Sequence, residues 1–521
     1  MPMPLIRFLA ALLLIAVLAT PVLKAKSAEP NDHLVIADAV GDYGPLAPLA
    51  HHRNGPGYVY TSYVFDTLVG QDPEGRAIPD LAQSWQVSAD GMLWNIMMDE
   101  KARWHDGLPV TANDVVFTIS YLRRHPYLFA SVANIGETEV LSDTSLRISL
   151  KRPDPDFLSS LLQSLPLLPR HIYRDQEIPG RFVAPRASIG SGPYRLVSYD
   201  KVQGRYLLER NASYHLGRSK YRRLAIVRMA PDPAIQAMRA GKVDIIPNLP
   251  IARIADVRAA GFGVETANSN HPVRLVFNSR GAFKERMLRH ALAYAIDRQA
   301  IVDIAFQGAA VIAETGYFQN GSPWRASGNT PSYSHAPETA VKLLRDCGWT
   351  RSAHGAWSRD GVPVRLKFIV GNSFLAVATV VSDQLAAFGI RTDLQVLENA
   401  AVQDRLRGGN YDLTILSSST MGGPNGIGRR VLSNSWRSDQ FRDENGAMST
   451  LLKEQERTID PERRQDLLQQ FQALYAQELP AYMLANPIWA TAHTNRVSPR
   501  YLPNGIAIGI PMALHKSMLM E

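Results

Sequence analysis

The sequence predicts an α/β protein built from more than one domain. Its 521 residues exceed what one hydrophobic core usually holds, so two or three domains are expected. Strand and helix patterns alternate between residues 364 and 416, which favours a largely parallel sheet with helices on its faces. The first third of the chain instead carries many short strands and turns. A hydrophobic content of 45% and a charged content of 20% are ordinary for a soluble globular protein.

Residues 1–27 have the composition of a secretory signal peptide. Arg7 precedes an uninterrupted apolar run from Phe8 to Ala19, and small residues follow up to Ser27. The apolar run is too short to span a bilayer. We therefore expect cleavage after Ser27 and export of the remaining chain. Cys347 is the only cysteine and lies far from the signal, so neither an internal disulfide nor a lipid anchor is expected. This favours a soluble periplasmic protein.

The charge pattern argues against nucleic-acid binding. The formal net charge is +8, and three of the basic residues lie within the first 27 positions. The remaining basic residues are scattered along the chain, whereas a nucleic-acid interface needs a dense basic face. A mildly basic surface is the expected reading.

Two tight turns and a capped helix lie between residues 80 and 122. Ala89-Asp90-Gly91 separates two apolar-alternating runs, Trp85–Val87 and Leu93–Met97, which predicts a β-hairpin. Trp104-His105-Asp106-Gly107 predicts a second turn, and Thr111 is placed to cap a helix.

Further elements follow along the chain. Gly190–Tyr194 reads as a turn before strands at 195–199 and 206–210. A strand ends at Asn278, and a helix over 286–298 is predicted from one buried stripe: Met287, Leu288, Ala291, Leu292, Ala295 and Ile296.

The later half predicts an α/β lobe. Strands are expected at 364–370, 392–397 and 411–416, with helices at 374–388 and 401–407 that stop at Gly389 and Gly408-Gly409. Asp460 is placed to cap a last helix with Pro461 at its first position.

The ordered motifs resemble the family 5 extracellular solute-binding proteins of ABC importers, the dipeptide, oligopeptide and nickel receptors. The resemblance rests on PDLAQSW, the DG turn, WHDG and TANDVV between residues 80 and 116, then on GSGPYRL, NASYHLG, LVFN and RMLRHALAYAIDR. It runs from about Val59 to Tyr475 and covers most of the chain.

The resemblance implies a periplasmic-binding-protein-like fold. Two α/β lobes would be joined by hinge crossovers near Phe277 and Asn486, with an extra α+β domain beside them. We expect lobe I to be assembled from residues 28–62, 190–277 and 487–521, the extra domain from 63–189, and lobe II from 278–486.

Ligands of open α/β sheets bind beyond the carboxyl ends of the strands, and two loops qualify. The first contains Asn372. The second, Ser417–Gly426, leaves the strand that ends at Leu416; each loop is also compatible with an ordinary polar surface loop that caps a helix. From the second loop we select Ser418, Ser419, Thr420, Met421 and Asn425.

The resemblance adds further candidates. Peptide receptors usually carry an aspartate in the second loop that pairs with the peptide ammonium, but this chain has no acid from Leu413 to Asn434. Arg429, just downstream, is placed to accept an anionic group. Tyr43 and Tyr63 fall where family members place aromatics near the cleft, and His271 lies near the expected hinge.

No catalytic constellation is visible in the sequence. It lacks GxSxG, HExxH and P-loop spacings, and the adjacent His51-His52 pair faces two ways, so neither an enzyme, a metal site nor a cofactor is expected. The predicted function is capture of a small solute between two lobes and its delivery to an ABC permease by a monomeric receptor. A di- or oligopeptide stands first. An opine, a sugar conjugate or a metal chelate, and from other classes a periplasmic hydrolase on a receptor scaffold or a sensory partner, remain open.

Overall fold

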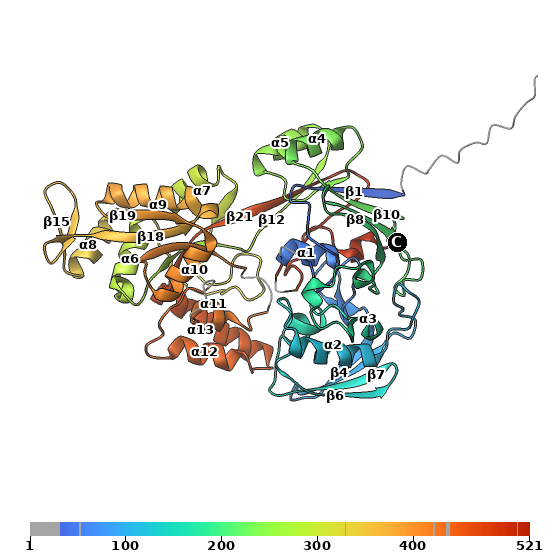
Figure 1. Ribbon diagram of the computed structural model, residues 1–521. Coiled ribbons are helices and arrows are strands. Elements are labelled where there is room, and N and C mark those ends of the chain that lie inside the picture. The colour runs from blue at the N-terminus through green and yellow to red at the C-terminus, as the bar shows by residue number, and fades with distance from the viewer. Residues whose placement is uncertain (1–31, 52–53, 329, 420–422, 434–437, 508) are drawn as a thin grey trace, which may run out of the picture.

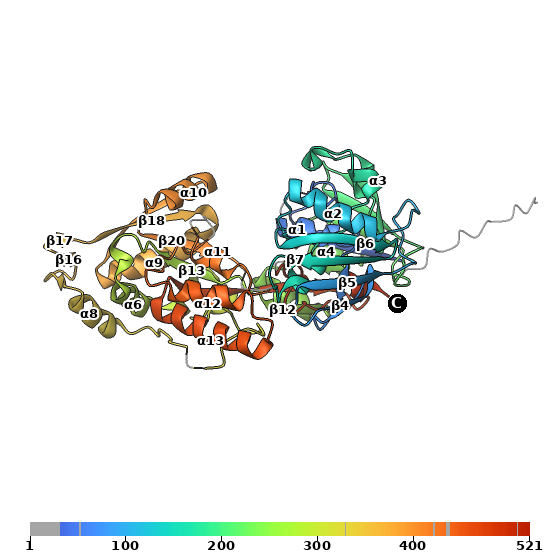
Figure 2. The ribbon, with the colours of Figure 1, turned by 90° about the horizontal axis from the view of Figure 1, so that it is seen from below.

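The computed structural model describes residues 32–51, 54–328, 330–419, 423–433, 438–507 and 509–521. Residues 1–27, where a signal peptide is expected, lie outside this part. Two bodies stand side by side and are joined by long strands at the centre of the molecule (Figures 1 and 2). Within the described residues, no helix combines the length and apolar character needed to cross a membrane.

The first body combines lobe I with the extra domain. Lobe I contains β1 (His33–Asp38), β8 (Tyr194–Asp200), β9 (Arg205–Arg210), β10 (Arg223–Arg228), β11 (Ile245–Ile246), β12 (Gly263–Asn268), α1 (Asn54–Thr61), α4 (Pro231–Arg239) and α5 (Ile254–Ala259). The extra domain has a hairpin of β2 (Val69–Gln71) and β3 (Ala77–Pro79). Its antiparallel sheet, in the order β4-β5-β7-β6, consists of β4 (Ala82–Val87), β5 (Leu93–Met98), β7 (Ser145–Leu150) and β6 (Ile135–Ser142), with helices α2 (Ala112–Arg124) and α3 (Arg170–Tyr173).

The second body is lobe II. Its strands are β13 (Val273–Phe277), β14 (Ala310–Ile312), β15 (Trp349–Arg351), β16 (Trp357–Arg359), β17 (Val362–Pro363), β18 (Arg365–Gly371), β19 (Arg391–Leu397) and β20 (Leu413–Ser417). Its helices are α6 (Arg286–Ala295), α7 (Arg298–Ala305), α8 (Pro337–Asp346), α9 (Leu375–Phe388), α10 (Asn399–Gly408), α11 (Ile427–Val431), α12 (Ala447–Gln455) and α13 (Pro461–Glu478).

Strand β21 (Ala481–His493) joins the two lobes. It continues one sheet in the order β19-β18-β20-β13-β21-β11-β1-β10-β9-β8. Its first part pairs with β13 of lobe II, and its last six residues pair with β12 of lobe I. The connection from β12 to β13 also passes from lobe I to lobe II. It does so between Asn268 and Val273, opposite Asn486, and the Ser269 hydroxyl donates to Asn486 Oδ1 at 2.9 Å. The residue limits predicted for the domains stay a prediction.

The turns and helix ends predicted from the sequence have the expected geometry. Gly91 and Gly107 take positive φ in their turns, and Thr111 with Asp114 forms a capping box at the start of α2. Gly389 and Gly409 end α9 and α10 in the left-handed region, which costs glycine little because it has no Cβ. The Asp460 side chain accepts from the Arg463 backbone N–H at 2.7 Å.

One expected core residue is exposed. Met287 keeps 39% of its surface, whereas Leu288, Ala291 and Leu292 of the same helix are fully buried. Helix α6 turns by about 100° per residue, so a position adjacent to the buried stripe can face solvent. The prediction that Met287 belongs to the core was wrong.

Candidate ligand-binding site

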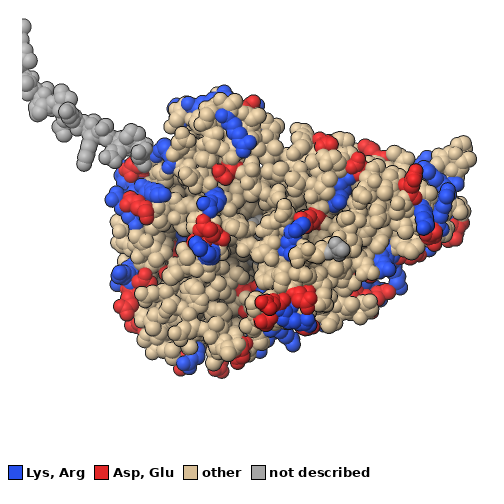
Figure 3. Space-filling view, turned by 180° about the vertical axis from the view of Figure 1, so that it is seen from behind, with Lys and Arg blue, Asp and Glu red and all other residues tan. Residues whose placement is uncertain are grey.

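Two cavities meet at the junction of the lobes. The lobe I cavity has a volume of about 320 Å³ and lies beside the last part of β21. The lobe II cavity, of about 340 Å³, lies against the start of α9. His271 and Trp489 line both cavities, and their rings stack with centroids 6.1 Å apart. The surface is hollowed between the two bodies in the view of Figure 3.

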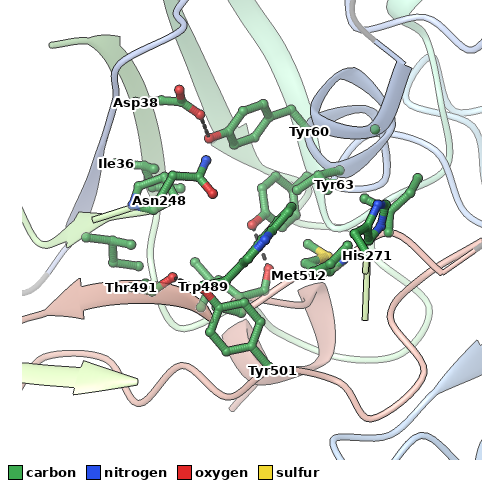
Figure 4. Close-up of a pocket in the computed structure, with 18 residues that line it drawn as sticks. Ile36, Asp38, Tyr60, Tyr63, Asn248, His271, Trp489, Thr491, Tyr501 and Met512 are labelled. Carbon is green, nitrogen blue, oxygen red and sulfur yellow. Dashed lines mark hydrogen bonds between the residues drawn. The ribbon is translucent and has the colours of Figure 1, made fainter. Parts of the chain in front are cut away.

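The polar end of the lobe I cavity is built from the carboxyl ends of two parallel strands. Ile36 of β1 pairs with Ile245 of β11. Strand β1 ends at Asp38, and β11 ends two residues before Asn248. Asn248 has a φ of 55°, a conformation that asparagine tolerates better than most residues. Figure 4 shows Asp38, Tyr60 and Asn248 at one end of the cavity, with Tyr501 at the other.

Asp38 is held in place by three donors. Its Oδ2 accepts from the hydroxyls of Tyr60 at 2.6 Å and Tyr43 at 2.8 Å, and its Oδ1 accepts from the Val40 backbone N–H at 2.9 Å. Asp38 as a whole keeps only 3% of its surface exposed. Burial and the nearby Asp38 charge raise the pKa of Tyr60 well above its usual value, so Tyr60 stays a neutral donor.

The walls of this cavity are aromatic and aliphatic. Tyr63 lines it and donates to the Leu514 carbonyl at 2.7 Å, while Trp489 and Thr491 project from the same face of β21. The segment 510–514, near the end of the chain, closes another side. Such a lining suits a ligand with a large apolar group, because removing apolar surface from water is favourable.

His271 occupies the boundary between the cavities. Its Nε2 is buried and makes no hydrogen bond within the described residues. Burial lowers the pKa of His271 to about 4; the Gly509 carbonyl opposes this shift and the charge of Arg430 adds to it. The imidazole is therefore neutral at pH 7, and an unpaired buried nitrogen is available to a bound molecule.

A buried ion pair supports the second predicted loop, Ser417–Gly426. Arg274 of β13 lies 2.6 Å from Asp439 and donates to the Ser418 hydroxyl oxygen at 3.0 Å. Both charged side chains are almost fully buried, and Tyr475 donates to the other Asp439 oxygen at 2.7 Å. Ser418 is thus positioned by a rigid support, which is the usual arrangement for binding loops.

Other predicted residues of this loop reach across to the first body. The Ser419 hydroxyl donates to the Gly509 carbonyl at 3.1 Å. The Asn425 backbone N–H donates to Asp156 Oδ2 at 2.8 Å and its side chain donates to Asp154 at 2.6 Å. Asp156 also pairs with Arg464 of α13 at 2.7 Å, with both side chains buried. Asn425 therefore belongs to a contact between lobe II and the extra domain, outside both cavities.

The remaining predicted site residues are dispersed. Tyr43 is fully buried behind Asp38, and Tyr63 lines the lobe I cavity. Asn372 and Arg429 are exposed and line neither cavity, while Ser373, next to Asn372, lines the lobe II cavity. Thr420 and Met421 lie outside the described residues. The structure thus brings Tyr63 and His271 together, and ligand contact by each selected residue stays a prediction.

One acidic cluster has metal-like spacing but holds a lysine. Asp66, Asp80 and His215 offer ligand atoms within 4.8 Å of one another. The Lys516 ammonium lies between the carboxylates, 2.7 Å from Asp80 and in contact with Asp66. Burial and the adjacent Asp66 raise the pKa of Asp80 to about 6. The Lys516 ammonium supplies the positive charge that balances these carboxylates. Its contacts with them anchor the C-terminal segment.

Sequence reasoning missed the residues that define the lobe I cavity, notably Asp38, Tyr60, Asn248 and Trp489. A signal for Asp38 existed. It ends the apolar run LVIAD, so the rule that ligands bind beyond carboxyl strand ends would have selected it. Asn248 follows a strand of only two residues, which no periodicity can reveal.

The comparison with protein families decides the classification. Residues 76–435 match the model of the bacterial extracellular solute-binding proteins, family 5. The chain belongs to this family. It is 27% identical over 400 residues to the nickel-binding periplasmic protein of Escherichia coli (strain K12), covering 71% of this chain and 72% of that protein.

Two further matches are similar in extent. The oligopeptide-binding protein AppA of Bacillus subtilis (strain 168) is 27% identical over 373 residues, covering 67% of this chain but 66% of AppA. The crystal structure of NikA from Brucella suis in complex with Fe(III)-EDTA superposes with a TM-score of 0.79 at 21% identity, covering 92% of this chain and all of NikA. The solved structure supports the two-lobed solute-binding fold.

Proposed function

We propose that this solute-binding protein captures peptides in the periplasm and delivers them to an ABC permease. The observation that carries the proposal is the apolar cavity at the carboxyl ends of β1 and β11, at the junction of two lobes. A side chain of a peptide can be buried there, while Ser417 and Ser373 on the lobe II side offer hydroxyls to its backbone. Oligopeptide binding by AppA, as its name states, supports the same ligand class.

A metal ion is less well supported as the cargo. Among the described residues, the one group of three metal-ligating side chains surrounds Lys516 and does not line either cavity. The cavities themselves offer the imidazole of His271, the carboxylate of Asp38 and the amide of Asn248, and the other lining side chains are mostly apolar, aromatic or hydroxylic. A hard or borderline cation prefers several oxygen, nitrogen or sulfur ligands.

Transport also requires that the two lobes close on the ligand. The lobes meet along β21 and β12–β13, where two strands cross between them, and such crossings are the usual hinges of domain closure. Ligand contacts to both lobes would favour the closed form. Periplasmic location and a monomeric state belong to this proposal.

A thermal-shift screen of residues 28–521 tests the proposal. The panel comprises a mixed dipeptide and oligopeptide library, nickel with histidine, Fe(III)-EDTA, opines and oligosaccharides. A ligand at about a hundredfold its dissociation constant stabilises by roughly 2.7 kcal/mol, which moves the midpoint by a few degrees.

We expect shifts with peptides, unchanged peptides on recovery, and no shift with the metal complexes. A shift with metal complexes or opines alone would overturn the peptide assignment. Product formation would instead identify a hydrolase.

A further inference from the structure

The buried aspartates of this protein differ in how their negative charge is balanced. Among the described residues seven aspartates are buried, and five of them pair with a lysine or arginine: Asp66, Asp80, Asp156, Asp244 and Asp439. Asp114 caps the positive N-terminus of α2. Within the described residues, Asp38 alone has neither a cationic partner nor a helix terminus.

The donors around Asp38 leave part of its acceptor capacity unused. A carboxylate has about four lone-pair positions, and Asp38 uses three of them for two tyrosine hydroxyls and one backbone N–H. All three donors are neutral, so they orient the carboxylate without balancing its charge. A buried charge is costly unless it is paired, which points to a cation supplied from outside the chain.

The surroundings define what that cation carries. Asp38 is the one charged side chain that lines either cavity among the described residues. Asn248 offers an amide at the end of the adjacent strand, where Figure 4 shows it near Asp38 and Tyr60. Beyond them the cavity is walled by aromatic rings and by Ile510 and Met512. An ammonium with an attached apolar group therefore matches this end of the site.

We propose that Asp38 binds the terminal ammonium of the peptide and that the cavity takes a large apolar side chain from its first residue. This inference rests on the proposed peptide function and names the substrate class, peptides with a free amino terminus and a hydrophobic first residue. Among the described residues that line the two cavities there is no lysine or arginine to pair with a carboxylate, so the carboxyl end of the peptide would lie outside them.

Calorimetric titration with matched ligands tests the proposal. The probe is Phe-Gly-Gly-amide, and its N-acetyl form removes the ammonium while keeping the ring. Phenethylamine retains the ammonium and the ring without a peptide bond. We expect acetylation to weaken binding about tenfold or more, since a charge-assisted hydrogen bond is lost, and phenethylamine to bind measurably.

Variants separate Asp38 from its neighbourhood. Asp38→Asn should weaken the free peptide about as much as acetylation does, and acetylation should then have little further effect. Asp42→Asn is the matched control, because Asp42 also accepts a tyrosine hydroxyl, from Tyr199, but lines neither cavity. It should leave the affinity unchanged.

The outcomes distinguish the two proposals. Equal affinity for free and acetylated peptide would overturn the role of Asp38 while peptide capture stands, whether or not the Asp38→Asn variant folds. Binding of phenethylamine without binding of any peptide would overturn peptide capture and retain the ammonium site. Failure of all three probes while other peptides bind would overturn the substrate class.

Discussion

Replacing Asp156 with asparagine should weaken ligand binding by favouring separation of the two bodies. Asp156 belongs to the extra domain, yet its side chain bonds to Arg464 at 2.7 Å and to the Asn425 backbone at 2.8 Å, both in lobe II. In the open form that the proposed lobe closure implies, this side chain would face water, where the change would cost little. In the closed form it leaves the Arg464 charge buried without a counter-charge.

The magnitude follows from burial. The side chains of Arg464 and Asp156 are 3% and 4% exposed, and removal of one partner from a buried pair costs about 3–5 kcal/mol. Because asparagine can still accept from the Asn425 N–H, the lower end of about 3 kcal/mol applies. Each 1.4 kcal/mol is a factor of ten, so the dissociation constant should rise by up to roughly 100-fold.

The assay is calorimetry with the peptide that binds most tightly in the thermal-shift screen, together with small-angle scattering of the protein bound to it. Glu456→Gln is the control, since Glu456 joins the same two bodies through Arg152 at 3.4 Å but both side chains are partly exposed. An exposed pair contributes less than about 1 kcal/mol, so its loss should change the affinity by no more than a few-fold.

An unchanged affinity in the Asp156→Asn variant would show that this ion pair does not hold the two bodies together. The prediction would also be contradicted if the free energy of unfolding of the ligand-free protein fell by as much as the free energy of binding. The pair would then stabilise the fold of one body instead of closure.

Two further predictions concern stability. Arg274→Met leaves Asp439 buried without its cation and should lower the free energy of unfolding by about 3–5 kcal/mol in urea titrations. Arg365→Met, which removes an exposed ion pair with Asp393, is the control and should change the free energy of unfolding by less than about 1 kcal/mol. Equal losses in the two variants would show that the buried pair does not stabilise the fold more than an exposed one. His271 has a folded pKa of about 4, so between pH 4 and 6.5 the unfolded chain binds more protons and stability gained from this group rises with pH. His271→Gln should flatten that rise in urea titrations at several pH values, and an unchanged slope would show that His271 does not titrate as inferred.

The elements of lobe II are predictable because local signals agree with the tertiary structure. Strand β18 and helix α9 follow from an apolar run, a 3.6-residue pattern and Gly389, and each lies within one residue of the predicted limits at its start. Helix α13 begins at Pro461, as its cap requires. Here sequence separation is short, and every preference points to the same structure.

The cavity is different because its parts are distant in the sequence. Asp38, Tyr63, Asn248 and Trp489 come together only when β1, β11 and β21 pair, and no periodic pattern records that pairing. The loop 417–426 was selected for its position beyond a strand end, its length and its polar side chains, yet Asn425 contributes to a contact between the two bodies. Polarity alone cannot distinguish a side chain that meets a ligand from one that meets another part of the protein.

The cavity joins the beginning and the end of the described chain, and this order has a consequence for biosynthesis. Asp38 lies on the first strand, while Ile510 and Met512 close the wall and Lys516 fastens that segment to Asp66 and Asp80. In a chain that is made from its amino terminus, Asp38 is synthesised long before residues 510–514, which close the wall. Contacts of such long sequence separation form slowly, because the intervening loop must be closed first. The full wall of the cavity can therefore form only after residues 510–516 have been made.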